Sequence, residues 1–152
     1  MKYLCLDYGE KRTGYAVSDQ GGSMAFARGV LVKKTRDVFF TELLRVIASE
    51  GAEAVVIGLP VRSDGSDSLT TRQVRNFAAS LARRLSLPLF FMEESYSSAE
   101  AESMLKASGQ KAYKRDGRID SLAAARILES FLHQPEDKRQ MIAGKDEKGN
   151  EL

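Results

Sequence analysis

An aspartate and a glycine directly after the first apolar segment are the residues of this chain best placed to do chemistry. The segment Tyr3-Leu4-Cys5-Leu6 is continuously apolar, which is typical of a strand buried on both faces, and it runs into Asp7-Tyr8-Gly9. Sheet proteins bind ligands at the carboxyl ends of their strands, where a glycine lets the backbone approach the ligand. Asp7 is therefore a candidate ligand for a metal ion or a phosphate group.

Two further acidic residues have comparable positions. Glu94 lies at the end of an apolar segment that begins at Leu89, and Asp120 opens the last predicted helix. Each acidic residue also has an ordinary alternative: Asp7 could shape a hairpin turn, Asp120 could be a helix N-cap, and Glu94 could be a solvated residue at a strand end. A strand-Asp-x-Gly turn also occurs in ATPases that bind phosphate. The turn alone is therefore compatible with a metal site, a phosphate site or an ordinary hairpin turn.

The elements that must position these residues predict an α/β fold. Three strands in an antiparallel meander are followed by a helix, a strand, a helix, a strand and two more helices. The strands are predicted at about 2–7, 13–18, 24–32, 54–60 and 89–92, and the first and last helices at about 37–50 and 119–132. Gly58 and Pro60 are expected to turn the fourth strand out of the sheet. Right-handed crossovers would make the last two strands parallel to the first.

Parallel strands share one carboxyl edge, so Asp7, Glu94 and Asp120 are expected to converge there. Like charges held close together are unfavourable unless a cation neutralises them. Carboxylate oxygens suit Mg²⁺ or Mn²⁺, and two such ions about 4 Å apart can activate water and stabilise the leaving oxygen in phosphodiester hydrolysis. The pattern thus favours a metal-dependent hydrolase.

Composition limits the other possibilities. A chain of 152 residues with 43% hydrophobic content fits one domain. We expect a cytoplasmic protein without a membrane partner, because we find neither a signal peptide nor an apolar run near the roughly 20 residues of a membrane helix. The single cysteine, Cys5, is expected to be a buried hydrophobe, and the lone His133 lies near the end of the last helix.

The charge pattern is more informative than the net charge of +2. One basic region precedes the fifth strand and a second precedes the last helix, and both could be nucleic-acid contacts or solvated helix faces. They comprise Arg62, Arg72, Arg75, Arg83 and Arg84, and then Lys111, Lys114, Arg115 and Arg118. The final segment, 135–152, is polar and charged, so we predict a domain over 1–134 and a flexible C-terminal tail.

Taken together, these motifs resemble the YqgF/RuvX family, a branch of the ribonuclease H-like superfamily related to the RuvC type of Holliday junction resolvase. The resemblance covers about residues 1–133. It is carried by four blocks in the family's order: Asp7 to Asp19, Gly58-Leu59-Pro60 with Asp64-Gly65-Ser66, Glu93 to Ser98, and Asp120-Ser121-Leu122-Ala123-Ala124-Ala125. Two positions depart from the family pattern: Glu93 replaces an aspartate, and Ser95 replaces an arginine that would suit a phosphate contact.

The resemblance implies a ribonuclease H-like fold with a five-stranded mixed sheet, consisting of a three-strand antiparallel meander and two parallel strands, flanked by helices. It also implies that Asp7, Glu94 and Asp120 are catalytic and bind Mg²⁺ or Mn²⁺. Lys11, Arg12 and Arg118 remain as candidate contacts to nucleic-acid phosphates.

For function, the resemblance implies an endonuclease that processes the 5′ end of pre-16S rRNA in ribosome biogenesis. The alternatives are a Holliday junction resolvase acting on branched DNA and a non-catalytic nucleic-acid-binding factor; a small ATPase is disfavoured because the chain lacks a second lobe. Resolution of a symmetric junction needs a dimer with two matched sites, and the sequence offers no obvious dimer helix. We therefore expect structured RNA as the partner, and a monomer or weak homodimer.

Overall fold

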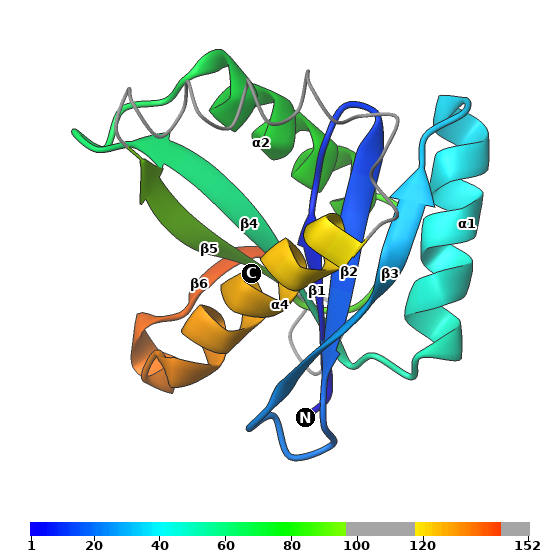
Figure 1. Ribbon diagram of the computed structural model, residues 1–152, viewed down its shortest axis with the longest axis horizontal. Helices are drawn as coiled ribbons and strands as arrows, with labels where there is room; N and C mark the ends of the chain where they lie inside the picture. The colour runs from blue at the N-terminus through cyan, green and yellow to red at the C-terminus, as the bar shows by residue number, and fades with distance from the viewer. Residues whose placement is uncertain (97–117, 144–152) are drawn as a thin grey trace.

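The computed structural model describes residues 1–96 and 118–143, and for Tyr96, Arg118 and Ala143 only the backbone. The helix predicted after Ser97 and the basic residues at 111–115 lie outside these ranges. The described elements form a six-stranded mixed sheet with helices on both faces (Figure 1). The strands are β1 (Tyr3–Asp7), β2 (Arg12–Ser18), β3 (Ala25–Val32), β4 (Ala54–Arg62), β5 (Leu89–Tyr96) and β6 (Gln140–Ala143). The helices are α1 (Arg36–Ser49), α2 (Leu69–Ala82), α4 (Arg118–His133) and the 3-10 turn η1 (Glu136–Lys138).

The sheet has the order β3-β2-β1-β4-β5-β6. β1, β2 and β3 form the predicted antiparallel meander, and β4 and β5 are parallel to β1 and to each other. The mixed α/β class and the two parallel crossovers are therefore confirmed. β3 also runs in the direction of β1, so the carboxyl ends of four strands lie at one edge of the sheet.

Alternation along the strands divides the core into two layers. Leu4 and Leu6 of β1 pack with α1 and α2 on one face, whereas Tyr3 and Cys5 pack with α4 on the other. Figure 1 shows α4 crossing the sheet in front of β1 and β2, with α2 behind them. Residues of α1 and α2 share the core cluster on the face opposite α4. A residue's parity in its strand thus decides which helices it meets.

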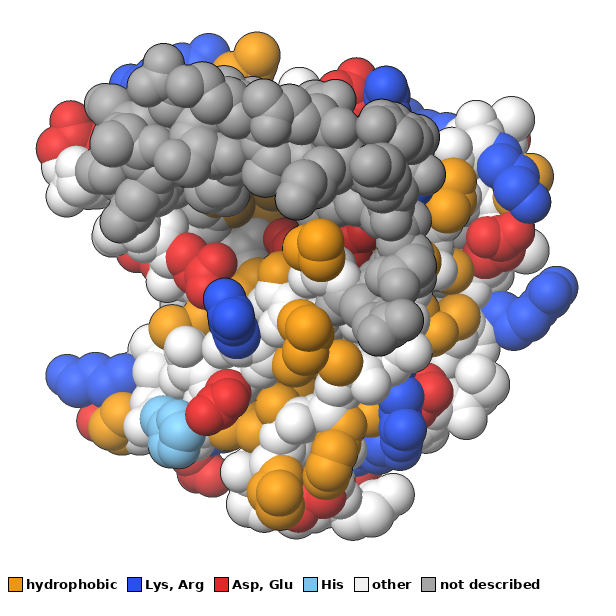
Figure 2. Space-filling model, in the orientation of Figure 1, with side chains coloured by type: hydrophobic (Ala, Val, Ile, Leu, Met, Phe, Trp, Pro, Cys, Tyr) orange, Lys and Arg blue, Asp and Glu red, His pale blue; other side chains and the backbone are white. Residues whose placement is uncertain are grey.

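The helix ends follow from their sequences. Thr35 caps α1 by accepting a hydrogen bond from the backbone N–H of Val38, and Gly51 leaves the helix with a φ of +68°. Ser68 and Thr71 form a reciprocal capping box at the start of α2. The outer face of α4 carries hydrophobic side chains, including Ile119 and Leu122, which are 54% and 53% exposed (Figure 2).

The prediction of five strands was one short. β6 pairs antiparallel with β5 and lies, with η1, in the segment predicted to be a flexible tail. Arg139 holds this segment to the core: its Nη1 donates to the Tyr3 hydroxyl at 3.0 Å, and its guanidinium lies 4.7 Å from the ring centroid of Phe131. The sequence did not predict this strand because the segment is charged, and its contact with the core is made by an arginine that packs on aromatic rings. The boundary at residue 134 stays a prediction.

β4 also differs from expectation, because it continues through Gly58 and Pro60 to Arg62 and stays paired with β5. The two residues do not turn the strand out of the sheet. A Cβ atom at Gly58 would lie 2.7 Å from Cδ1 of Ile127 in α4. Gly58 therefore serves helix packing.

No described helix combines the length and apolar character needed to cross a membrane.

Candidate metal centre

Asp7 is the last residue of β1 and lies at the carboxyl edge of the sheet. Its register partner in β2 is Gly14, and its parity directs its half-buried side chain to the face covered by α4. Tyr8, the next residue, packs on the opposite face with the α1 and α2 layer. The end of β1 thus directs a carboxylate to one face of the sheet and a phenol to the other.

Asp120 is brought toward Asp7 because α4 packs on Gly14, the register partner of Asp7. A Cβ atom built on Gly14 would overlap the backbone carbonyl of Asp120 and would lie 2.9 Å from its Cβ. The first turn of α4 therefore rests directly on β2, opposite Asp7, where only a glycine leaves room. Asp120 is 6% exposed and belongs to this first turn. The prediction that Asp7 and Asp120 share one location is consistent with this packing.

Glu94 lies on the same face but farther along the edge. Leu6 is level with Ile57 in β4, and Ile57 is level with Phe91 in β5. Asp7 is therefore level with Met92, and Glu94 is two residues beyond. With strands about 4.8 Å apart and about 3.3 Å of rise per residue, the Cα atoms of Asp7 and Glu94 are roughly 12 Å apart. Glu94 does not end β5, which continues to Tyr96.

The charges of both carboxylates act on the same buried thiol. Burial raises the pKa of Cys5 well above its usual value, and the charges of Asp7 and then Glu94 raise it further. Cys5 is fully buried, as expected of a small hydrophobe. The Glu94 side chain keeps exposed surface, yet desolvation by the atoms around it raises its pKa.

The donor set suits a hard divalent cation, but it is not closed. Within residues 1–96 and 118–143, no three Asp, Glu, His or Cys side chains lie close enough together to hold a metal ion as they stand. The spacing between Asp7 and Glu94 explains this. The carboxylate chemistry and the shared face fit Mg²⁺ or Mn²⁺.

The predicted phosphate contacts lie at the turn between β1 and β2 and at the start of α4. Lys11 is exposed in the turn between β1 and β2, and Arg12 is half-buried at the start of β2. Arg118 begins α4, next to Asp120 in sequence, and its side chain lies outside the description. Among the arginines at 62–84, Arg75 pairs with Asp67 at 3.0 Å, and Arg84 lies over the ring of Phe40.

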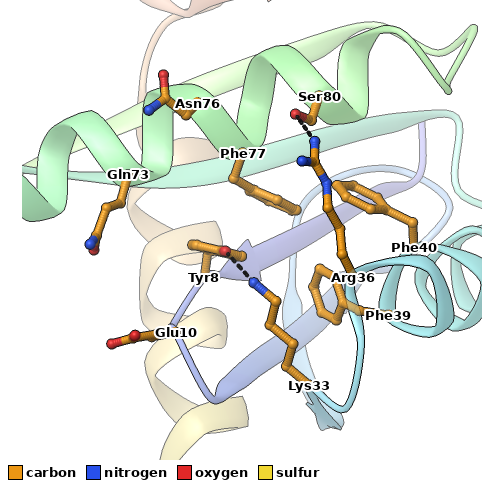
Figure 3. A pocket seen from close by; sticks show the side chains of 10 residues that line it. All are labelled: Tyr8, Glu10, Lys33, Arg36, Phe39, Phe40, Gln73, Asn76, Phe77 and Ser80. Carbon is orange, nitrogen blue, oxygen red and sulfur yellow. Dashed lines mark hydrogen bonds between the residues drawn. The ribbon is translucent and has the colours of Figure 1, made fainter.

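Sequence reasoning missed a second group of cations at the same edge. Lys33 and Arg36 line a groove between α1 and α2 (Figure 3). The groove lies on the face of the sheet opposite the one to which Asp7 is directed. The signal was present in the run from Lys33 to Phe40, where cations precede two adjacent phenylalanines. The helix predicted at about 37–50 accounts only for the end of this run.

The fold places this chain in the ribonuclease H-like class. It resembles the solved structure of RuvC from Thermus thermophilus in complex with a Holliday junction substrate, with a TM-score of 0.53 over 93% of this chain and 99% of that one. Identity is 16%, so this likeness shows the fold alone.

The sequence then gives the particular family. The model of the RuvX family, described as Holliday junction resolvase, matches residues 1–134, and the chain belongs to this family. A relative from Nitratidesulfovibrio vulgaris (strain Miyazaki F) is 56% identical over 139 residues, which are 91% of this chain and 98% of the relative. One from Oleidesulfovibrio alaskensis is 51% identical over 95% of this chain and all of the relative. Both bear the name "Putative pre-16S rRNA nuclease". The resemblance inferred from the four sequence blocks is confirmed.

Proposed function

We propose that this protein is a metal-dependent endonuclease that hydrolyses phosphodiester bonds of structured RNA and processes the 5′ end of pre-16S rRNA in ribosome biogenesis. The observation that carries the proposal is the placement of Asp7, Asp120 and Glu94 on one face of the sheet at its carboxyl edge. The names of relatives that are 56% and 51% identical over most of the chain support the RNA substrate.

Asp7, Glu94 and Asp120 are the residues that would hold Mg²⁺ or Mn²⁺. When bound, such ions supply activation of water and neutralisation of the charge that develops on the leaving oxygen. Asp120 is positioned by the packing of α4 on Gly14, and Asp7 by its place in the central strand of the sheet. Glu94 approaches from β5, where desolvation raises its pKa.

The basic residues next to the site would orient the substrate. Lys11 and Arg12 lie at the end of the loop that follows Asp7, where they can contact substrate phosphates. Arg118 would act from the start of α4. We place the reaction in the cytoplasm and expect a monomer or a weak homodimer.

A Holliday junction resolvase is the second candidate, since the family bears that description. The test compares an RNA that spans the 5′ end of the pre-16S region with a four-way DNA junction, each with Mg²⁺ or Mn²⁺. Cleavage of the RNA alone supports the proposal. Cleavage of the junction alone would replace it with the resolvase, and binding of either substrate without cleavage would leave a nucleic-acid-binding factor.

A further inference from the structure

A groove of about 300 Å³ lies between α1 and α2, on the face of the sheet opposite α4. Its floor is aromatic: the rings of Tyr8 and Phe77 stack with their centroids 4.1 Å apart, and Phe39 and Phe40 adjoin them. Gln73 and Asn76 of α2 lie along its rim (Figure 3). The volume is at the small end of the range for ligand sites, roughly 300–1,000 Å³, which suits one nucleotide and excludes a duplex.

Cations enter this groove from the α1 side and contact neutral groups there. Nζ of Lys33 donates a hydrogen bond to the Tyr8 hydroxyl at 3.3 Å. Nη2 of Arg36 donates to Oγ of Ser80 at 2.9 Å, and its guanidinium lies 5.8 Å from the Phe40 centroid. Figure 3 shows both side chains reaching across the groove toward these partners.

Two arginines at the end of α2 add to the positive charge. Arg83 donates to the Ser80 hydroxyl at 3.2 Å, and Arg84 donates to the Ser80 carbonyl at 2.8 Å. In the described part of the chain, the ion pairs involve Lys2, Arg28 and Arg75, and none of Lys33, Arg36, Arg83 and Arg84. Among the described residues, Glu10 is the one acidic residue that lines the groove. Cations held by rings and neutral oxygens keep their charge for an anionic ligand.

The position of the groove links it to the acidic residues. Asp7 and Tyr8 are consecutive, and strand alternation directs Asp7 to the α4 face and Tyr8 to the groove. The loop that separates the two sites is fixed by a hydrogen bond of 2.9 Å from the Lys33 backbone N–H to the Lys11 carbonyl. A strand of RNA that crosses this edge can thus contact both faces.

We propose that the groove between α1 and α2 binds one nucleotide of a single-stranded segment of the RNA substrate. Lys33 and Arg36 hold its phosphate, the edge of the aromatic floor contacts its sugar and base, and Gln73 and Asn76 offer amide hydrogen bonds to the base. The identity of the strand as RNA rests on the proposed nuclease function. The groove would then hold the substrate a short distance from the scissile bond and set which bond reaches Asp7.

Binding is tested without cleavage, in an Asp7→Asn background with chelator present, by titrating a fluorescent single-stranded RNA oligonucleotide. The test variant is Lys33→Gln with Arg36→Gln. The matched control is Lys34→Gln with Arg45→Gln, which removes the same charge from exposed positions of the same two segments that do not line the groove. Circular dichroism confirms that each variant is folded.

We expect the test pair to weaken binding by about tenfold or more at moderate salt and to reduce the salt slope by roughly 0.7, the value for one phosphate of a single strand. The control pair should change binding by less than about threefold. Equal weakening by both pairs, or none by the test pair, would overturn the proposal. Binding of adenosine monophosphate as tight as that of the oligonucleotide would show a free-nucleotide site and would also overturn it.

The two proposals fail in different ways. If the protein with an intact Asp7 does not cleave RNA but the test pair still weakens binding selectively, the nuclease chemistry fails and the groove stands. If cleavage occurs and the test and control pairs bind alike, the groove fails and the nuclease stands.

Discussion

Replacement of Gly14 by alanine tests how α4 is seated on the sheet. Gly14 does not have a positive φ, so its backbone conformation would accept alanine, and the change would otherwise gain roughly 0.4–1 kcal/mol of stability. The added Cβ, however, would overlap the Asp120 carbonyl and lie 2.9 Å from its Cβ. Backbone atoms on both sides cannot move aside as a flexible side chain would, so we expect a net loss of about 3 kcal/mol, at the upper end of ordinary overpacking.

The loss should appear in both stability and catalysis. A change of about 3 kcal/mol lowers the melting temperature by roughly 6–12 °C for a domain of this size. The first turn of α4 must shift by about 1 Å, and a misplacement of that size can lower the rate about 100-fold. We would measure urea unfolding and the rate of metal-dependent RNA cleavage for Gly14→Ala at a temperature where the variant is folded.

Gly21→Ala is the control. Its Cβ would meet only Oδ2 of Asp19 at 3.6 Å, an ordinary contact, so stability and activity should stay near the wild-type values. If Gly14→Ala behaves like Gly21→Ala in both assays, α4 does not rest on β2 as described, and the placement of Asp120 beside Asp7 is wrong.

Three further perturbations have defined outcomes. Glu94→Gln should lower metal-dependent cleavage by about 100-fold or more, whereas Glu93→Gln, whose side chain faces the other side of β5, should keep the wild-type rate within about threefold; equal losses in initial rates would contradict the assignment of faces. The pKa of Asp19 is lowered to about 2, chiefly by the backbone N–H of Met24, so its contribution to stability is present above its ordinary pKa of 3.8 and is lost as the pH falls toward 2. Asp19→Asn should therefore lower the free energy of unfolding at neutral pH, and urea titrations across this pH range should show the difference shrinking; a constant difference would refute the cause given. Arg139→Ala should cost about 2 kcal/mol and speed amide exchange in β6, and unchanged exchange there would show that this arginine does not anchor the strand.

Much of the fold was predictable because its signals are local. The apolar run before Asp7 and the helical spacing over α1 and α4 depend on nearby residues only. β6 was not predictable in this way, since its stability comes from pairing with β5 and from the contact of Arg139 with Phe131, far away in sequence. The same holds for Gly58, which suggested a strand end but serves packing against α4.

The candidate site was predictable to the level of an edge of the sheet. The topology rule brings Asp7, Glu94 and Asp120 to one edge. Strand parity puts Asp7 and Glu94 on one face, and the packing of α4 on Gly14 brings Asp120 to the same face. The spacing between them depends on strand register, which the sequence does not show. The groove was missed because Lys33 and Arg36 look like ordinary loop and helix-start residues until α2 packs beside them.

In the proposed function, Asp7 acts in metal-dependent cleavage rather than in folding. The most direct measurement is the rate at which wild type, Asp7→Asn and Asp37→Asn cleave an RNA that spans the 5′ end of the pre-16S region in Mn²⁺ or Mg²⁺, with unfolding curves for all three. Asp37 is exposed in the first turn of α1, so it controls for the loss of one negative charge. We predict that cleavage is abolished by Asp7→Asn, is retained by Asp37→Asn, and that all three proteins are folded. Cleavage at the wild-type rate by a folded Asp7→Asn protein would show that Asp7 takes no part in the reaction.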